Sequence, residues 1–241
     1  MRLSIIPALA LAALSLFDLS ATACAAQPED SVVRVRSIGA DGSVNVGSGV
    51  ILGPETVATA CHVTRRAARI EVTHGMQQWQ TTGQTGSALH DLCVLHVPIS
   101  EVPRIRMRAP EDLHAGEAVT AIGFQGTSGE LMVRRGVVAA LYAYDGSYVI
   151  RTSAAFDFGA SGGGLFDEAG NLVGILAFKA RTGENLRFAL PSDWLSPASP
   201  VATSFNTITA ASNISAFWER TQEERPSFLG VALREVSNTG R

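Results

Sequence analysis

Short apolar runs rich in β-branched residues recur along this chain of 241 residues, and turn-forming residues separate them. Typical runs are Val57 to Val63, Val119 to Phe124 and Leu172 to Phe178, and Asp145-Gly146 is a typical turn signal between them. No amphipathic helical pattern of about 10–15 residues lies between these runs. The spacing therefore predicts an all-β fold of antiparallel barrels or sandwiches.

Composition and charge exclude several classes of protein. Hydrophobic residues make up 46% of the chain and charged residues 17%, which fits a compact globular protein rather than a disordered tail, a coiled coil or a collagen. The 19 basic and 22 acidic side chains give a net charge of −3, and no basic cluster is denser than Arg65 to Arg69. We therefore expect no nucleic-acid partner. No Cys-x-x-Cys or His-rich pair has the spacing of a zinc site, so we expect neither a metal nor a cofactor.

Residues 1–26 have the features of a bacterial secretory signal peptide. Arg2 supplies a positive charge, Ile5 to Phe17 are almost all apolar, and Ala21 to Ala25 offer small-x-small cleavage sites. The apolar stretch is shorter than the roughly 20 residues that span a bilayer. We expect export to the periplasm or the medium. A lipoprotein anchored at Cys24 is the alternative, because Ala21 to Cys24 distantly resembles a lipoprotein box.

The segment from Phe158 to Phe166, which reads Phe-Gly-Ala-Ser-Gly-Gly-Gly-Leu-Phe, is the strongest chemical signal in the chain. A catalytic serine must be exposed, must be deprotonated by a base and must lie beside oxyanion donors. Glycines on both sides of Ser161 let the backbone turn sharply, so that the N–H groups of Gly159 and Ser161 point at one oxygen. A glycine-rich turn that contains an ordinary serine is the alternative interpretation of this motif alone.

Residue order then narrows the choice of base. All five histidines precede Ser161, which excludes the serine–acid–histidine order of α/β-hydrolases. His62 is the best candidate base because it closes an apolar run, and Asp91 opens the next such run as the candidate acid. A buried carboxylate needs a partner, and an imidazole N–H is a suitable one. For the other histidines, including His90, we expect solvated or packing roles.

These motifs together resemble the trypsin-like serine proteases, specifically their bacterial Deg/Htr-type branch. The resemblance covers roughly Val32 to Trp194. It rests on the strand motif Val46 to Leu52, the histidine motif Thr59 to Val63, the aspartate motif Asp91 to Leu95, two strand motifs at 116–124 and 135–138, the serine motif Thr152 to Leu165, and the closing strand Leu186 to Pro191. It implies a double six-stranded antiparallel β-barrel with the active site in the cleft between the barrels. The domains implied are a signal peptide at 1–26, a protease at 27–194 and an extension at 195–241 without a PDZ domain.

The resemblance also implies roles for single residues in the hydrolysis of a polypeptide. Ser161 attacks the peptide carbonyl, His62 takes its proton, Asp91 orients the imidazole, and the N–H groups of Gly159 and Ser161 bind the oxyanion. Ala160 replaces the aspartate that receives a new N-terminus in the digestive enzymes, so that mode of activation is not expected. No acid lies among the residues expected at the P1 pocket, so a small or medium apolar P1 residue is expected; these residues are Ala155, Leu176 and Ala177.

Two alternatives stay open at this point. The first is a catalytically silent trypsin-like domain that binds partners through its surface. The second concerns Cys61 and Cys93, which flank the candidate base and acid. If His62 and Asp91 are hydrogen-bonded, the neighbouring Cα atoms could fall within the roughly 4.4–6.8 Å of a disulfide, and export supplies an oxidising compartment. A pair of buried reduced thiols is the alternative.

Overall fold

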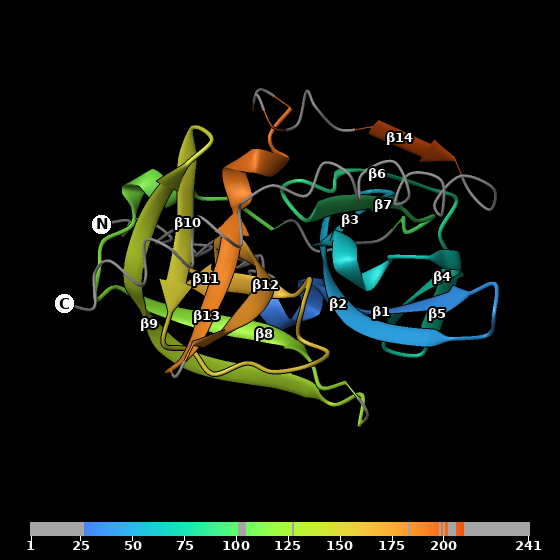
Figure 1. Ribbon diagram of the computed structural model, residues 1–241, viewed down its shortest axis with the longest axis horizontal. Coiled ribbons are helices and arrows are strands. Elements are labelled where there is room, and N and C mark those ends of the chain that lie inside the picture. Colours follow the sequence, from blue (N-terminus) through green and yellow to red (C-terminus); the bar gives the residue numbers. More distant parts are fainter. Residues whose placement is uncertain are drawn as a thin grey trace, which may run out of the picture.

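The structure is a computed structural model that describes residues 27–100, 105–126, 128–182, 184–197, 199, 201 and 206–209 (Figure 1). The signal peptide expected at 1–26 lies outside the described residues, as does most of the extension expected at 195–241.

The described residues are mostly β-structure, as the recurring apolar runs predict. The strands are β1 (Val32–Gly39), β2 (Val44–Gly53), β3 (Thr56–Ala60), β4 (Ala67–His74), β5 (Gln77–Gln80), β6 (Gly83–Ser87), β7 (Leu92–His96), β8 (Ala118–Phe124), β9 (Leu131–Tyr144), β10 (Ser147–Thr152), β11 (Gly164–Asp167), β12 (Leu172–Thr182), β13 (Glu184–Pro191) and β14 (Asn206–Thr209). Short 3₁₀ helices are η1 (Pro28–Ser31), η2 (Cys61–Val63), η3 (Pro110–Asp112) and η4 (Ser192–Leu195).

The strands form two units that lie side by side (Figure 1). The C-terminal unit is a closed barrel of six strands in the order β10-β13-β12-β11-β8-β9. The N-terminal unit is a curled sheet of eight strands in the order β14-β6-β7-β3-β2-β1-β4-β5. The predicted all-β class with two barrel-like units is therefore confirmed. Within the described residues, β14 extends the N-terminal sheet by pairing with β6 at its edge.

Several strands of the N-terminal sheet are buried on both faces. Side chains alternate between the two faces of a strand, and Ile51 of β2 belongs to the core of the N-terminal sheet. Its neighbour Val50 belongs to a second cluster, which also contains Phe166 and Ile175 of the barrel. Burial on both faces explains why these strands read as continuous apolar runs instead of alternating ones.

The predicted disulfide between Cys61 and Cys93 is present in the structure, with its Cα atoms 5.0 Å apart. Strands β3 and β7 pair antiparallel with Thr59 opposite Cys93, which brings the two cysteines together. Both side chains are completely buried in the core of the N-terminal sheet. The bridge therefore joins the end of β3 to β7 inside that core.

We expect the double substitution Cys61→Ala/Cys93→Ala to lower the free energy of unfolding. The cysteines are separated by 32 residues, and cross-linking a loop of that size stabilises a fold by about 3–4 kcal/mol through restriction of the unfolded chain. Urea denaturation of the protein, purified without reductant, measures the change. Reductant should bring the wild type close to the double variant and leave the variant unaffected. Equal midpoints for oxidised wild type and variant would contradict the prediction.

Candidate active site

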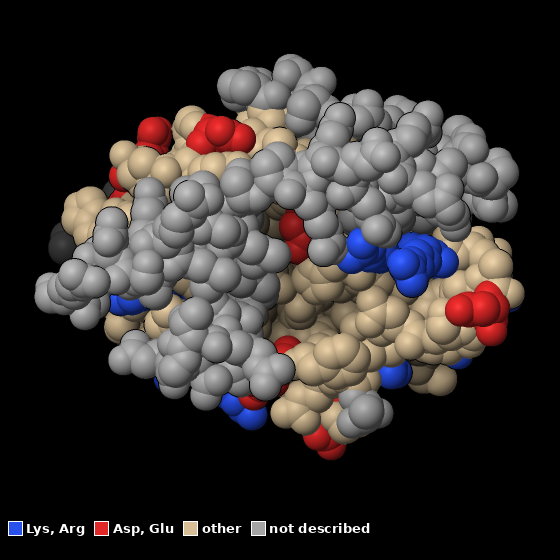
Figure 2. Space-filling view, in the orientation of Figure 1, with Lys and Arg blue, Asp and Glu red and all other residues tan. Residues whose placement is uncertain are grey.

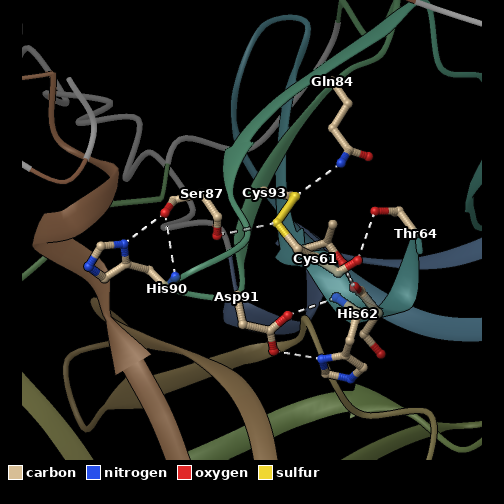
Figure 3. The surroundings of a disulfide bond; sticks show 10 residues. Cys61, His62, Thr64, Gln84, Ser87, His90, Asp91 and Cys93 are labelled. Atoms are coloured by element: carbon tan, nitrogen blue, oxygen red, sulfur yellow. Dashed lines mark hydrogen bonds and ion pairs between the residues drawn. A yellow bond between two sulfur atoms is a disulfide. The ribbon is translucent and has the colours of Figure 1, made fainter. Parts of the chain in front are cut away.

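His62 and Asp91 come together because β3 and β7 pair with Ala60 opposite Leu92. His62 follows the end of β3 within η2, and Asp91 directly precedes β7. The Asp91 carboxylate binds His62 twice: Oδ2 lies 2.6 Å from the ring Nδ1, and Oδ1 accepts the backbone N–H at 2.8 Å (Figure 3). The Asp91 carbonyl also accepts the Cys61 N–H at 2.9 Å. Both oxygens of the carboxylate are thus used to hold one histidine.

The backbone of Asp91 adopts a left-handed conformation, with φ of +53°. Non-glycine residues seldom adopt this region, although aspartate does so more readily than most. Such a conformation persists only where surrounding contacts enforce it. At Asp91 those contacts include the hydrogen bonds to Cys61 and His62. The position of the Asp91 carboxylate is therefore fixed by the constrained backbone of Asp91 as well as by its hydrogen bonds to His62.

Opposing effects act on the pKa of His62. Burial of the ring lowers this pKa, but the charge of Asp91 and its hydrogen bond raise it by more, and nearby Arg65 opposes them slightly. The net result is a pKa above the ordinary imidazole value. With Nδ1 engaged by Asp91, Nε2 has no hydrogen-bond partner among the described residues. The side chain is 40% exposed, so Nε2 is the nitrogen that remains to exchange a proton.

Ser161 lies in the tight turn that leads into β11. Gly162 has φ of +88°, and a Cβ at this position would collide with the Ser48 carbonyl oxygen, so only glycine fits. The partly exposed Ser161 hydroxyl donates to the carbonyl of Ala177 in β12, at 3.0 Å. No hydrogen bond joins Ser161 to His62 in the described part of the chain. Catalytic hydrogen bonds are often absent or long without substrate.

The peptide that joins Phe158 to Gly159 has a fixed orientation. The Phe158 carbonyl accepts the Gly126 N–H at 3.0 Å. In a trans peptide the N–H points away from the carbonyl oxygen, so this bond turns the Gly159 N–H to the opposite side. Gly159 has φ of +95°, and a Cβ there would collide with the Gly126 backbone. The glycine is thus required both by its conformation and by its close neighbour.

The peptide that joins Ala160 to Ser161 is oriented in the same way. The Ala160 carbonyl accepts the Gly163 N–H at 2.9 Å, which turns the Ser161 N–H to the other side. In the described structure neither this N–H nor that of Gly159 donates to a protein acceptor. Two backbone donors on either side of Ala160 are therefore available to an incoming oxygen. That the N–H groups of Gly159 and Ser161 form an oxyanion hole stays a prediction.

Ser48 of β2 connects the N-terminal sheet to the serine segment, and it is completely buried. Its hydroxyl donates to the Gly159 carbonyl at 2.8 Å and accepts the Phe124 N–H at 2.7 Å. Its backbone N–H donates to the Ser161 carbonyl at 2.8 Å, and its own carbonyl accepts the Thr59 hydroxyl at 2.7 Å. One residue of the first unit thus holds the carbonyls of both Gly159 and Ser161 in the second.

In the sequence, Ser48 stands out only as part of the strand motif Val46 to Leu52. The signal that could have identified it is a polar residue placed between two glycines in an otherwise apolar strand, Val46 to Leu52. A Cβ at Gly47 would lie 3.0 Å from the Ser161 carbonyl oxygen and still closer to the Val63 side chain. Glycine beside Ser48 therefore permits the close approach of the two units.

The residues expected at the P1 pocket occupy two different settings. Ala155 is exposed in the loop after β10, whereas Leu176 and Ala177 are buried in β12. The Leu176 carbonyl accepts the Gly162 N–H at 2.6 Å, and its N–H donates to the Gly163 carbonyl at 2.8 Å. Strand β12 therefore runs directly beside the serine turn. The pocket itself remains a prediction.

Figure 2 shows the face that contains the junction of the two units, hollowed near its middle and lined there mainly by uncharged residues. Lysines and arginines on this face gather mainly over the N-terminal sheet, and acidic residues are scattered over both units. Within the described ranges, no group of three or more His, Cys, Asp or Glu side chains could hold a metal ion. No helix in the described part of the chain is long and apolar enough to cross a membrane.

Comparison with known proteins shows the family. The family model for the trypsin-like peptidase domain matches residues 47–175, so the chain belongs to this family. The match includes the positions of His62, Asp91 and Ser161. Proteases of the Deg/HtrA type are among its relatives.

Curated relatives give the extent of the similarity. The chain is 32% identical over 172 residues to the peroxisomal leader peptide-processing protease of Homo sapiens, covering 63% of this chain and 30% of the relative. It is 30% identical over 162 residues to the serine endoprotease DegS of Haemophilus influenzae, covering 62% of this chain and 47% of the relative. The chain thus spans between 30% and 47% of the length of these relatives.

Solved structures of related proteases share the fold. The HtrA-type protease AlgW with tripeptide is 26% identical, with a TM-score of 0.61 over 71% of this chain and 62% of that chain. The serine endoprotease from Yersinia pestis is 28% identical, with a TM-score of 0.62 over 70% of this chain and 61% of that chain. The two-unit arrangement seen here is therefore that of HtrA-type proteases.

We expect Ser48→Ala to lower kcat for peptide hydrolysis by up to about 100-fold, because small displacements of reacting groups have effects of that size. The substitution frees the Gly159 carbonyl and leaves the Phe124 N–H without its acceptor. Ser192→Ala is the matched control, since it also removes a buried hydroxyl that donates to a carbonyl, that of Arg108. Both variants should lose similar stability in thermal unfolding, and only Ser48→Ala should lose kcat. Equal kcat for the two variants would contradict the assigned role.

Proposed function

We propose that this protein is an exported serine endopeptidase that cleaves polypeptides through Ser161, His62 and Asp91, with an acyl-enzyme intermediate. One observation carries the proposal. The Asp91 carboxylate holds the Nδ1 of His62 at 2.6 Å in one unit, while the glycine-flanked Ser161 turn lies across the junction in the other. The same three residue types, in this order along the chain, serve as acid, base and nucleophile in the trypsin-like mechanism.

The proposed reaction begins when the Ser161 hydroxyl leaves the Ala177 carbonyl and turns toward Nε2 of His62. This exchange replaces one hydrogen bond by another, and a typical net bond contributes about 0.5–1.5 kcal/mol. His62 accepts the proton as Ser161 Oγ attacks the peptide carbonyl, and Asp91 stabilises the resulting imidazolium. The N–H groups of Gly159 and Ser161 receive the oxyanion.

Collapse of the tetrahedral intermediate breaks the C–N bond, and His62 gives its proton to the leaving amine. The acyl group remains on Ser161 Oγ. Water then attacks the ester with His62 again as the base, which releases the acid product and restores the serine. Each step uses the same base and the same two backbone donors.

The proposal includes the organisation predicted from the sequence: a signal peptide at 1–26, a protease domain at 27–194 and an extension from 195, with the mature protein in the periplasm or secreted. Relatives named as serine proteases support polypeptide substrates, and the signal-peptide features of residues 1–26 support export. Ala155, Leu176 and Ala177 are proposed to shape a P1 pocket for a small or medium apolar side chain. A silent domain that binds partners is the competing function, and the hydrogen bond from Ser161 to Ala177 is the observation that favours it.

We expect Ser161→Ala to abolish hydrolysis of casein and of a peptide library without changing the fold, because it removes the nucleophile. A fluorophosphonate probe should label the wild type at Ser161 and leave the variant unlabelled. Ser43→Ala, which removes an exposed hydroxyl that donates to Asp41, should keep both labelling and turnover. Equal turnover by Ser161→Ala and wild type would refute the assignment. A folded wild type that neither reacts nor hydrolyses would establish the silent domain.

We expect kcat/KM to rise with pH, with an apparent pKa above the ordinary imidazole value. His62 acts as a base only when neutral, and Asp91 raises its pKa after burial has lowered it, so activity is lost as pH falls through that raised pKa. Asp91→Asn should move this limb to lower pH and lower kcat by about 10⁴-fold. Initial rates between pH 5 and 9, roughly the range of imidazole titration, measure both effects. A limb that stays in place in Asp91→Asn would count against the pairing.

A further inference from the structure

His90 is a buried histidine that the proposed mechanism does not use. It directly precedes Asp91 and is only 5% exposed, so it is not solvated. Both of its ring nitrogens are bonded: Nδ1 lies 2.8 Å from the Ser87 hydroxyl, and Nε2 lies 2.7 Å from the Asp145 carboxylate. Figure 3 shows the ring turned away from the His62–Asp91 pair and toward Ser87.

The partners of His90 belong to different units. Ser87 ends β6 in the N-terminal sheet, whereas Asp145 lies in the turn between β9 and β10 of the barrel. The ring also packs edge-on against Trp194 of η4, with centroids 4.8 Å apart, and near Tyr144 at 6.2 Å. His90 therefore reaches from the turn that carries Asp91 into a site formed by the barrel.

We propose that His90 is a positioning residue for the acid: its bonds to Ser87 and Asp145 fasten the Ser87–Asp91 turn to the barrel and so fix the Asp91 carboxylate for His62. The inference rests on the proposed function, because it assigns a role within that same site.

The turn from Ser87 to Asp91 is only weakly closed by its own backbone. Within it, the Asp91 N–H reaches the Ala88 carbonyl at a long 3.3 Å, and Asp91 has a positive φ. The Ser87 hydroxyl bridges this turn: it lies 2.8 Å from Nδ1 of the His90 ring and accepts the His90 backbone N–H at 3.4 Å. The hydrogen bonds between Ser87 and His90 therefore close the turn, and His90 directly precedes Asp91. Loss of these bonds frees the turn to relax its positive φ.

The position of the nucleophile also supports this role. Ser161 belongs to the barrel, and the acid and base belong to the N-terminal sheet. Ser48 secures the serine segment to the sheet, while the His90–Asp145 pair secures the acid's turn to the barrel. In both contacts a residue of the N-terminal unit bonds a residue of the barrel. A displacement of about 1 Å between reacting groups lowers rates by up to about 100-fold, so both contacts bear on catalysis.

The test removes the carboxylate that holds His90. Asp145→Gly suits this purpose, because Asp145 has φ of +42° and glycine adopts that conformation without strain. We expect kcat to fall about tenfold with KM within about twofold, since the acid is displaced and the substrate contacts are not. Asp145→Asn, in contrast, keeps an oxygen that accepts from His90 Nε2 and should retain most of the wild-type kcat. Glu55→Gly is the matched control, an exposed acid at φ of +59° in the β2–β3 turn, and should leave kcat unchanged.

A second variant removes the other partner of the His90–Asp145 contact. His90→Phe keeps a ring against Trp194 and removes both hydrogen bonds. It should lower kcat about as much as Asp145→Gly, and the double variant should lose little more, because the two act through one contact. A kcat of wild-type size in both single variants would overturn the inference, as would additive losses in the double variant.

A spectroscopic readout separates this inference from the proposed function. The proton between His62 Nδ1 and Asp91 gives a resonance that reports their hydrogen bond without any turnover. It should shift or broaden in Asp145→Gly and stay unchanged in Glu55→Gly. An unchanged resonance in Asp145→Gly would refute the positioning role, even in a protein found to be inactive. An inactive wild type whose resonance moves in Asp145→Gly would instead refute the proposed function and keep the positioning role.

Discussion

The buried contact of Ser48 with the serine segment is the interaction on which the geometry of the candidate site depends. The proposed nucleophile, Ser161, belongs to the barrel and the proposed base, His62, to the N-terminal sheet, so the two units must meet in one register. Each polar group of Ser48 finds a partner, and two of those partners are the carbonyls of Gly159 and Ser161. A buried polar group without a partner is unfavourable, so a shifted register would leave several groups unsatisfied. The junction is therefore specific as well as apolar.

Most of the contacts that shape each half of the candidate site lie within its own unit. The β3–β7 pairing and the Cys61–Cys93 bridge place Asp91 beside His62 inside one sheet. The serine turn is shaped by its own glycines and by hydrogen bonds from Gly126 and Gly163. Contacts from the opposite unit complete each half: Ser48 binds the serine segment, and Asp145 binds His90 beside the acid. Precision across the junction is then the remaining requirement, and it falls on the cross-unit hydrogen bonds.

The sequence predicted what depends on local pattern and missed what depends on distant contacts. The all-β class follows from the apolar runs, and the pairing of His62 with Asp91 follows from polar residues at two strand ends. The Ser48–Gly159 bond joins residues 111 positions apart, and the His90–Asp145 bond joins residues 55 apart, so no local pattern announces them. Strand β14 pairs with β6 although its segment lacks an apolar run, because an open sheet edge supplies backbone partners to almost any sequence.

The orientation of the Ser161 hydroxyl decides how far this structure is from a working site. If the N–H of Gly159 or of Ser161 pointed the wrong way, its peptide would have to flip before it could bind an oxyanion. Such a flip would break the hydrogen bond that Gly126 or Gly163 donates to this segment. In this structure the N–H groups of Gly159 and Ser161 already point away from the carbonyls that Gly126 and Gly163 bind. The Ser161 hydroxyl, in contrast, donates to the Ala177 carbonyl and not to His62. Rotation about one side-chain torsion passes between staggered wells and leaves the backbone in place. For the proposed mechanism, the Ser161 side chain is therefore a group that must turn before His62 can accept its proton.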